Sequence, residues 1–89
     1  MSDIDTRFTQ AIDDVKQLSE RPGDLTLLRL YALYKQATAG DAPDDRPGGL
    51  DIVGRYKHDA WAALKGVAPD TAKQDYIDLV AQLQNDAQS

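Results

Sequence analysis

Four stretches of helical periodicity, separated by breaks at Pro and Gly, occupy most of this 89-residue chain. In the first stretch, Ile4, Phe8, Ala11 and Val15 recur at spacings of three and four residues, so they form one apolar stripe along a helix. Proline and glycine interrupt this periodicity between the stretches, as they do at helix ends. The sequence therefore predicts an all-α protein, with helices over residues 4–19, 25–39, 51–65 and 69–87.

Capping signals define the helix ends. Ser2 or Asp3 is expected to cap the first helix and Asp24 the second, because short polar side chains accept hydrogen bonds from the free N–H groups of a first turn. Gly40 and Gly66 are placed where the second and third helices are expected to end. The predicted apolar set of the third helix comprises Val53, Tyr56, Ala60, Trp61 and Leu64.

The connection between the second and third helices, residues 40–50, contains two of the four Pro and three of the six Gly. Helices in bundles are usually joined by roughly two to eight residues, and short loops force antiparallel neighbours. A longer loop can run back along the bundle. We therefore expect the second and third helices to be parallel.

The second helix carries apolar residues around most of its circumference, including Leu25, Leu27, Leu28, Leu30 and Leu33. A helix of this kind must bury more than one side. In so small a domain, the second side is expected to meet either a ligand or a protein partner.

Composition limits the function classes. The net charge of −5 argues against a general nucleic-acid or anionic-membrane surface, and the absence of Cys excludes thiolate metal sites. Apolar runs of five residues are far below the roughly 20 needed for stable membrane insertion, and the acidic start is unlike a secretory signal. We expect one cytoplasmic domain over residues 1–89 that is a monomer and needs no cofactor or metal.

Aromatic and basic residues gather in the middle of the chain. Tyr31 and Tyr34 share one helix face, and Lys35 lies on the same side. Two phenols beside an ammonium group can bind a flat phosphorylated ligand, although tyrosines at the edge of a core show the same pattern. Between Arg29 and Lys65 the charge balance is +1, whereas the rest of this −5 chain carries −6. A local positive potential of this kind suits a compact anion.

Catalytic signals are weak. His58 is the one histidine, and no serine stands in a G-x-S-x-G context. A nucleophile and base can nevertheless come from distant positions, so a small thioesterase stays an alternative. We expect a protein without catalytic residues.

At the same residues the sequence resembles the acyl-CoA-binding protein family. The run Tyr31-Ala-Leu-Tyr-Lys-Gln-Ala-Thr-Ala-Gly-Asp41 is similar to its central signature, and Arg46-Pro47-Gly48 opens a segment similar to its second. That second segment continues through Asp51, Gly54, Arg55, Lys57, Ala60-Trp61 and Leu64-Lys65-Gly66, while Phe8, Ala11, Val15, Leu18, Pro22 and Tyr76 match elsewhere.

The resemblance implies a four-helix up-down-down-up bundle that binds long-chain fatty acyl-CoA esters reversibly, for intracellular carriage or buffering. It implies that Tyr34 meets the adenine, that Lys35 meets the 3′-phosphate, and that Lys57 with Tyr31 meets the other phosphates. Tyr76 is implied at the ribose-adenine end. The full implied ligand-binding set is Lys16, Tyr31, Ala32, Leu33, Tyr34, Lys35, Arg55, Lys57 and Tyr76, with Ile12 and Leu28 as candidates for the acyl groove.

Two interpretations stay open beside this one. The Tyr/Leu face of the second helix suits a helical protein-interaction module, and the fold could persist after ligand binding has been lost. His58 stands where the family often has tryptophan. We expect it to be a half-exposed surface residue rather than a ligand contact.

Overall fold

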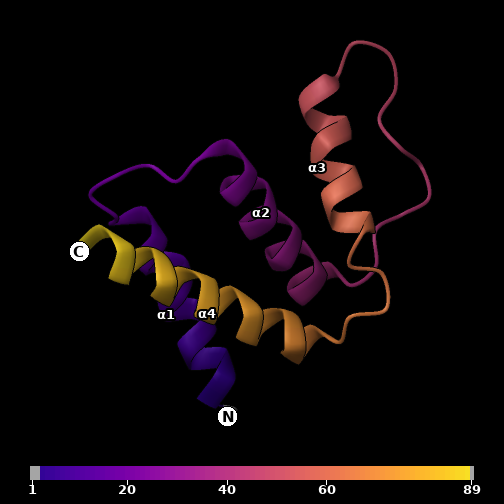
Figure 1. Cartoon of the computed structure of the whole chain (residues 1–89). Helices are drawn as coiled ribbons and strands as arrows, with labels where there is room; N and C mark the ends of the chain where they lie inside the picture. Colours follow the sequence, from indigo (N-terminus) through magenta and orange to yellow (C-terminus); the bar gives the residue numbers. More distant parts are fainter. Residues whose placement is uncertain (1–2, 89) are drawn as a thin grey trace.

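The computed structural model describes residues 3–88, which form four helices (Figure 1). They are α1 (Asp3–Lys16), α2 (Asp24–Ala39), α3 (Ile52–Ala62) and α4 (Pro69–Gln88). In Figure 1, α1 and α4 run in one general direction while α2 and α3 run in the other. The all-α class, the up-down-down-up order and the parallel α2–α3 pair are therefore as predicted.

The helices pack in the spatial order α1, α4, α2, α3. Helix α4 contacts both α1 and α2, whereas α3 contacts α2. This row makes the molecule flat, with extents of 40 × 32 × 16 Å. Three of the four helices build the core, and α3 adds no fully buried side chain to it within the described residues. The buried core consists of Phe8 and Ala11 of α1, Leu30, Leu33 and Ala37 of α2, and Ala72, Tyr76 and Val80 of α4.

The apolar residues around most of the circumference of α2 match its place between α4 and α3. Leu30 and Leu33 are buried in the core that α2 shares with α4, and the helix also packs along α3. The expectation that α2 buries more than one side is thus confirmed, but its second side meets α3 rather than the ligand or protein partner that was expected there. Leu25 lies at the start of the helix and stays 84 % exposed.

Several predicted helix ends were wrong, each for a local reason. Helix α1 ends at Lys16 rather than residue 19, and Gln17 N–H bonds the Asp14 carbonyl three residues back, which is the tighter spacing of a terminal turn. Helix α2 begins at Asp24 itself, because Gly23 holds the cap position. The capping role predicted for Ser2 lies outside the described residues, and Asp3 is helical.

Helix α3 is shorter than predicted at both ends. Asp51 precedes it and caps it by accepting a hydrogen bond from Gly54 N–H at 3.0 Å. After Ala62 the chain makes further turns with three-residue spacing, from Leu64 N–H to the Trp61 carbonyl at 2.9 Å. Gly66 then adopts a φ of +87°, a conformation that glycine reaches without steric cost. This turn directs the chain into α4.

Candidate functional site

Two lysine–aromatic contacts cross the α2–α3 interface in opposite senses. The Lys57 Nζ atom of α3 lies 5.2 Å from the Tyr31 ring centroid on α2. The Lys35 Nζ atom of α2 lies 5.0 Å from the Trp61 ring centroid on α3. Within residues 3–88, neither ammonium group forms an ion pair with a carboxylate. We call Tyr31, Lys35, Lys57 and Trp61 the cation cluster.

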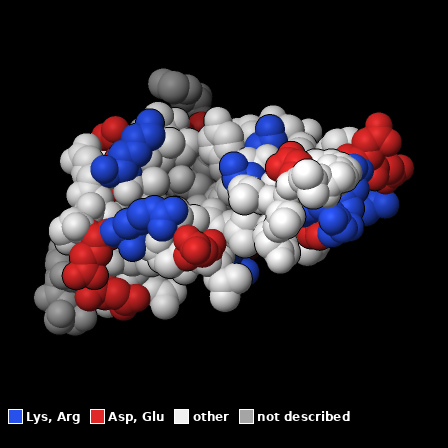
Figure 2. Space-filling view, turned by 90° about the horizontal axis from the view of Figure 1, so that it is seen from above, with Lys and Arg blue, Asp and Glu red and all other residues white. Residues whose placement is uncertain are grey.

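The cation cluster has the chemistry of an anion site. An ammonium group over an aromatic face is attracted by the ring quadrupole but keeps its N–H donors for other acceptors. Tyr31 and Lys35 are half-buried and Lys57 is exposed, so the charges are accessible from solvent. Acidic and basic side chains are interspersed over the face shown in Figure 2, so positive potential on this acidic chain is local.

An aromatic group lies next along α2. The Tyr34 ring stacks on Phe8 of α1 with centroids 6.2 Å apart, and the Tyr76 ring of α4 meets Phe8 edge-on at 5.2 Å. Tyr34 is 40 % exposed, whereas Tyr76 is buried. Burial, with a smaller effect from Tyr34, raises the pKa of Tyr76. The Tyr76 phenol therefore stays protonated and can donate a hydrogen bond at neutral pH.

The structure places the other predicted site residues less closely together. Ala32 and Leu33 are buried, so their side chains pack inside the protein rather than face solvent. Lys16 is exposed in the last turn of α1, and Arg55 is half-buried on α3. No hydrogen bond, ion pair or ring contact in the described part of the chain joins Lys16 or Arg55 to the cation cluster. The acyl-groove candidates Ile12 and Leu28 are both half-buried.

Sequence reasoning missed two residues that shape this region. Trp61 was assigned no ligand-binding role, yet its ring lies beneath Lys35, and its spacing of four from Lys57 was a usable signal. Gln36 is buried beside the cluster and donates from Nε2 to the Asp41 carboxylate at 2.8 Å and to the Val67 carbonyl at 2.9 Å. No sequence pattern indicated this contact between positions 31 residues apart.

Asp41 fixes the C-terminal ends of α2 and α3 to each other. Its Oδ1 atom accepts from Gly66 N–H at 2.9 Å as well as from Gln36. The Gly66 bond, with the Gln36 bond second, lowers the pKa of Asp41 below its ordinary value. The end of the interface that carries Lys35 and Trp61 is therefore held by hydrogen bonds in addition to packing.

The segment of residues 40–46, which we call the strap, is attached to α3. The Gly40 carbonyl accepts from Trp61 Nε1 at 2.7 Å, and Arg46 makes two bonds to the Asp59 carboxylate at 2.9 and 2.6 Å. His58 Nε2 lies 2.6 Å from the Pro43 carbonyl. His58 is of intermediate exposure, and the contact with the strap leaves its side chain 12 % exposed.

The apolar set predicted for α3 is only partly buried. Val53 is 63 % exposed and Tyr56 is 60 % exposed, whereas Trp61 and Leu64 are half-buried. The reason is that α3 packs on α2 alone, so one apolar side of the helix has no protein neighbour within the described residues. Leu50 and Ile52 extend this exposed apolar surface at the start of the helix.

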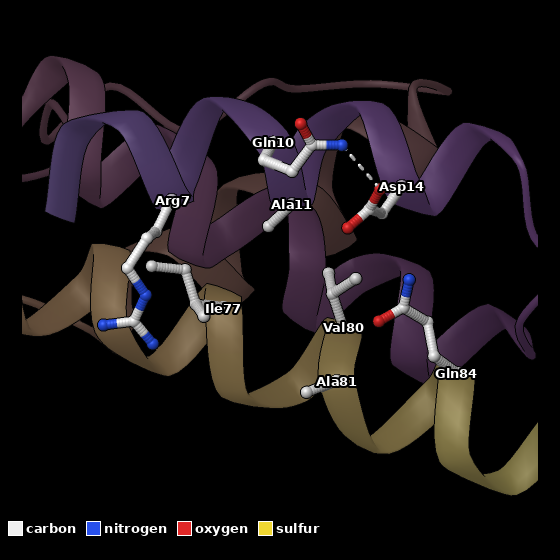
Figure 3. A pocket seen from close by; sticks show the side chains of 8 residues that line it. All are labelled: Arg7, Gln10, Ala11, Asp14, Ile77, Val80, Ala81 and Gln84. Carbon is white, nitrogen blue, oxygen red and sulfur yellow. Dashed lines mark hydrogen bonds between the residues drawn. The ribbon is translucent and has the colours of Figure 1, made fainter. Parts of the chain in front are cut away.

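A separate groove of about 210 Å³ lies between α1 and α4. Figure 3 shows Ala11 and Val80 at its base, and Arg7 and Gln84 at its edges. None of the predicted ligand-binding residues lines it. This groove is an alternative location for a ligand, and a structure with bound ligand would distinguish it from the cation cluster.

Residues 3–88 contain no group of three or more acidic or histidine side chains arranged to hold a metal ion. None of their helices combines the length and the apolar character needed to cross a membrane.

A flat, four-helix domain with lysine–aromatic pairs across one interface defines a small helical ligand-binding protein. The chain matches the family model described as acyl CoA binding protein over residues 5–80. It is 46 % identical over 81 residues to an acyl-CoA-binding protein homolog of Manduca sexta, covering 90 % of each chain. It is similar to the crystal structure of Oryza sativa acyl-CoA-binding protein 2, with 38 % identity, a TM-score of 0.90 and coverage of 96 % and 94 %. The chain therefore belongs to the acyl-CoA-binding protein family.

Another relative is a longer protein. Rattus norvegicus enoyl-CoA delta isomerase 2 is 45 % identical over 82 residues, which is 92 % of this chain but 21 % of that protein. The chain thus spans about a fifth of the length of this relative and about nine tenths of the Manduca sexta homolog. The shared part is the acyl-CoA-binding domain.

Proposed function

We propose that this protein binds long-chain fatty acyl-CoA esters without transforming them, and that it carries or buffers them in the cytoplasm as a single-domain monomer. The observation that carries the proposal is the crossed pair of lysine–aromatic contacts between α2 and α3. Three of the four residues in these contacts, Tyr31, Lys35 and Lys57, are among those that the resemblance implies for the polyanionic head group.

Each end of the ligand has a matching surface. Lys35 and Lys57 present ammonium groups to the phosphates of the coenzyme, where charge-assisted hydrogen bonds are roughly twice as strong as neutral ones. In the proposed complex, Tyr34 stacks on the adenine, with Lys35 at the 3′-phosphate. Tyr76 donates from its protonated phenol at the ribose-adenine end, and Tyr31 assists Lys57 at the remaining phosphates.

The acyl tail requires apolar cover. We place it against Leu28 of α2 and Ile12 of α1, with Val53 and Tyr56 supplying further exposed apolar surface on α3. Burial of one methylene contributes about 0.8 kcal/mol, so ten buried methylenes contribute about 8 kcal/mol. Nanomolar affinity requires about 12 kcal/mol net, after the costs of ordering. A few charged contacts to the head group supply the difference.

Lys16 and Arg55 are proposed to lie at the periphery of the ligand site. Both are cations without an ion-pair partner in residues 3–88, and we place Lys16 near the ligand and Arg55 near the rim of the site. Ala32 and Leu33 act through packing, since they support the turn of α2 that presents Tyr31, Tyr34 and Lys35.

Binding is tested by titrating palmitoyl-CoA while following Trp61 fluorescence and the melting temperature. Lys35 lies over the Trp61 ring, so a phosphate that draws Lys35 away changes the emission. A ligand at one hundred times its Kd stabilises the fold by about 2.7 kcal/mol. Unchanged emission and an unchanged melting temperature would reject the proposal.

The non-catalytic part of the proposal has its own test, because one relative carries the name of an isomerase. Palmitoyl-CoA and an enoyl-CoA are each incubated with the protein, with the ester in molar excess. We expect no released thiol and no shifted double bond after many hours, while both esters remain bound. Multiple turnovers of either ester would show that the chain is an enzyme.

A further inference from the structure

Helix α3 is held less by packing than the other helices. It contacts α2 alone, and none of its 11 residues, all of which lie in the described part of the chain, is fully buried. A helix with few buried apolar contacts is free to shift at low energetic cost. Yet α3 carries Lys57, whose ammonium group is placed 5.2 Å from the Tyr31 ring. Something other than the helix–helix interface must fix that position.

The strap supplies polar contacts on the residues that follow Lys57. Asp59 receives two hydrogen bonds from Arg46, which is the paired geometry that restricts orientation as well as distance. This contact is also an ion pair, and the Arg46 bond lowers the pKa of Asp59 below its ordinary value. Asp59 is therefore charged, and paired with Arg46, at neutral pH.

His58 makes the second contact. A backbone carbonyl accepts only, so the short contact with the Pro43 carbonyl places a proton on Nε2, which donates. The Nδ1 atom is buried without a hydrogen-bond partner and lies 3.8 Å from the Asp59 carboxylate. The ring thus spans the gap between the strap and the helix, one residue after Lys57.

We propose that His58 and Asp59 are positioning residues, which use the strap to hold Lys57 where it meets the phosphates of the ligand. The part of this inference in which Lys57 meets the ligand phosphates rests on the proposed function. The placement of Lys57 over Tyr31 can be tested without a ligand.

The first test measures that placement in the ligand-free protein. The Tyr31 ring current shifts the NMR signals of the Lys57 ε-methylene group, so the shift reports how closely the two side chains approach. We expect Asp59→Asn to remove at least half of the shift, His58→Phe to remove part of it, and Asp59→Glu to restore most of it. The matched control is Lys73→Gln, which removes an ion pair between α4 and Asp5 of α1.

The second test is a double-mutant cycle on palmitoyl-CoA affinity. If Asp59 acts through Lys57, then Asp59→Asn raises the Kd about tenfold in the native background, as expected for one misplaced charge-assisted contact. In a Lys57→Ala background the same substitution then changes the Kd by less than twofold. Circular dichroism at the measuring temperature identifies the variants that are folded, and His58→Phe replaces Asp59→Asn if the latter unfolds.

The outcomes separate the two claims. Full retention of the Lys57 shift in folded Asp59→Asn and His58→Phe overturns the positioning role, and so does an additive cycle. An equal loss of the shift in Lys73→Gln also overturns it, because the effect is then one of general stability. If native protein binds no palmitoyl-CoA, the proposed function fails, and the ligand-free shift still decides the positioning role.

Discussion

The ammonium group of Lys57 on α3 lies 5.2 Å from the ring centroid of Tyr31 on α2, and Lys35 and Trp61 repeat this relationship with the helices exchanged, at 5.0 Å. Two positive charges are thus brought to one helix interface although the residues are 22 positions apart in the sequence. Each charge lies over a ring of the opposite helix, and in the described residues neither is paired with a carboxylate. This arrangement suits a ligand with several phosphates.

Replacing Lys35 tests the assignment of one phosphate. We expect Lys35→Ala to weaken palmitoyl-CoA binding at least tenfold, because it removes a charge-assisted contact. It should also abolish most of the preference for esters that carry the 3′-phosphate over dephospho esters. Calorimetry on both esters measures this, with Lys65→Ala as a control of equal charge change. If native protein binds the two esters equally, Lys35 does not contact that phosphate.

The length of the acyl chain tests burial of the tail. Affinity should rise by about 0.8 kcal/mol for each methylene that enters the apolar surface and should level off when that surface is filled. Calorimetry with esters of rising chain length gives this series, with free coenzyme A as the reference without a tail. Equal affinity along the whole series would mean that the tail stays in water.

Leu33 separates packing from ligand contact. Its side chain is 1 % exposed, so Leu33→Ala should lower the free energy of unfolding by about 2–5 kcal/mol through the cavity it leaves. The affinity of the folded variant for palmitoyl-CoA should change less than twofold. Denaturant unfolding and titration at low temperature measure the two quantities. If the loss of binding free energy were much larger than the loss of unfolding free energy, Leu33 would be in direct contact with the ligand.

Acid should loosen the strap and the α2–α3 junction. The pKa of Asp59 is lowered by its bonds from Arg46, and that of Asp41 by its bonds from Gly66 and Gln36. A lowered folded-state pKa gives stability that is full above the unfolded value near 3.8 and is lost as the pH falls below it. Melting temperatures from pH 7 to pH 2.5 should therefore drop most steeply below about pH 4.

The variant Asp41→Asn gives this acid effect a control. It should have a lower melting temperature than native protein at pH 7, and that temperature should fall less on acidification. Asp44→Asn, a neighbouring substitution with the same charge change, should follow the native curve. Parallel curves for native protein and Asp41→Asn would show that the Asp41 carboxylate contributes no pH-dependent stability.

Periodicity was sufficient to predict the helices, and Phe8 and Ala11 of the apolar stripe predicted for the first helix do become buried in the core. It failed at the ends of α3, where turns with three-residue spacing continue past Ala62 and replace the last helical turn. It also failed for Val53 and Tyr56, since an apolar pattern does not reveal whether a neighbouring helix exists to cover it.

The sequence predicted only the part of the site that lies on one helix. Tyr31, Tyr34 and Lys35 are local on one helix, so their shared side follows from spacing alone. Two contacts of the strap cross a loop without periodicity. Arg46 bonds Asp59, 13 residues later, and the Pro43 carbonyl contacts His58, 15 residues later. Such contacts depend on how the loop folds back. A single sequence contains no signal for them.

The most direct measurement of the central claim is a structure of this protein with bound palmitoyl-CoA. We expect the coenzyme phosphates to contact the ammonium groups of Lys35 and Lys57, the adenine to lie against Tyr34, and the acyl chain to lie on the apolar surface that includes Leu28. A complex in which the ligand occupies the α1–α4 groove beside Ala11 and Val80, with the cation cluster unoccupied, would contradict it.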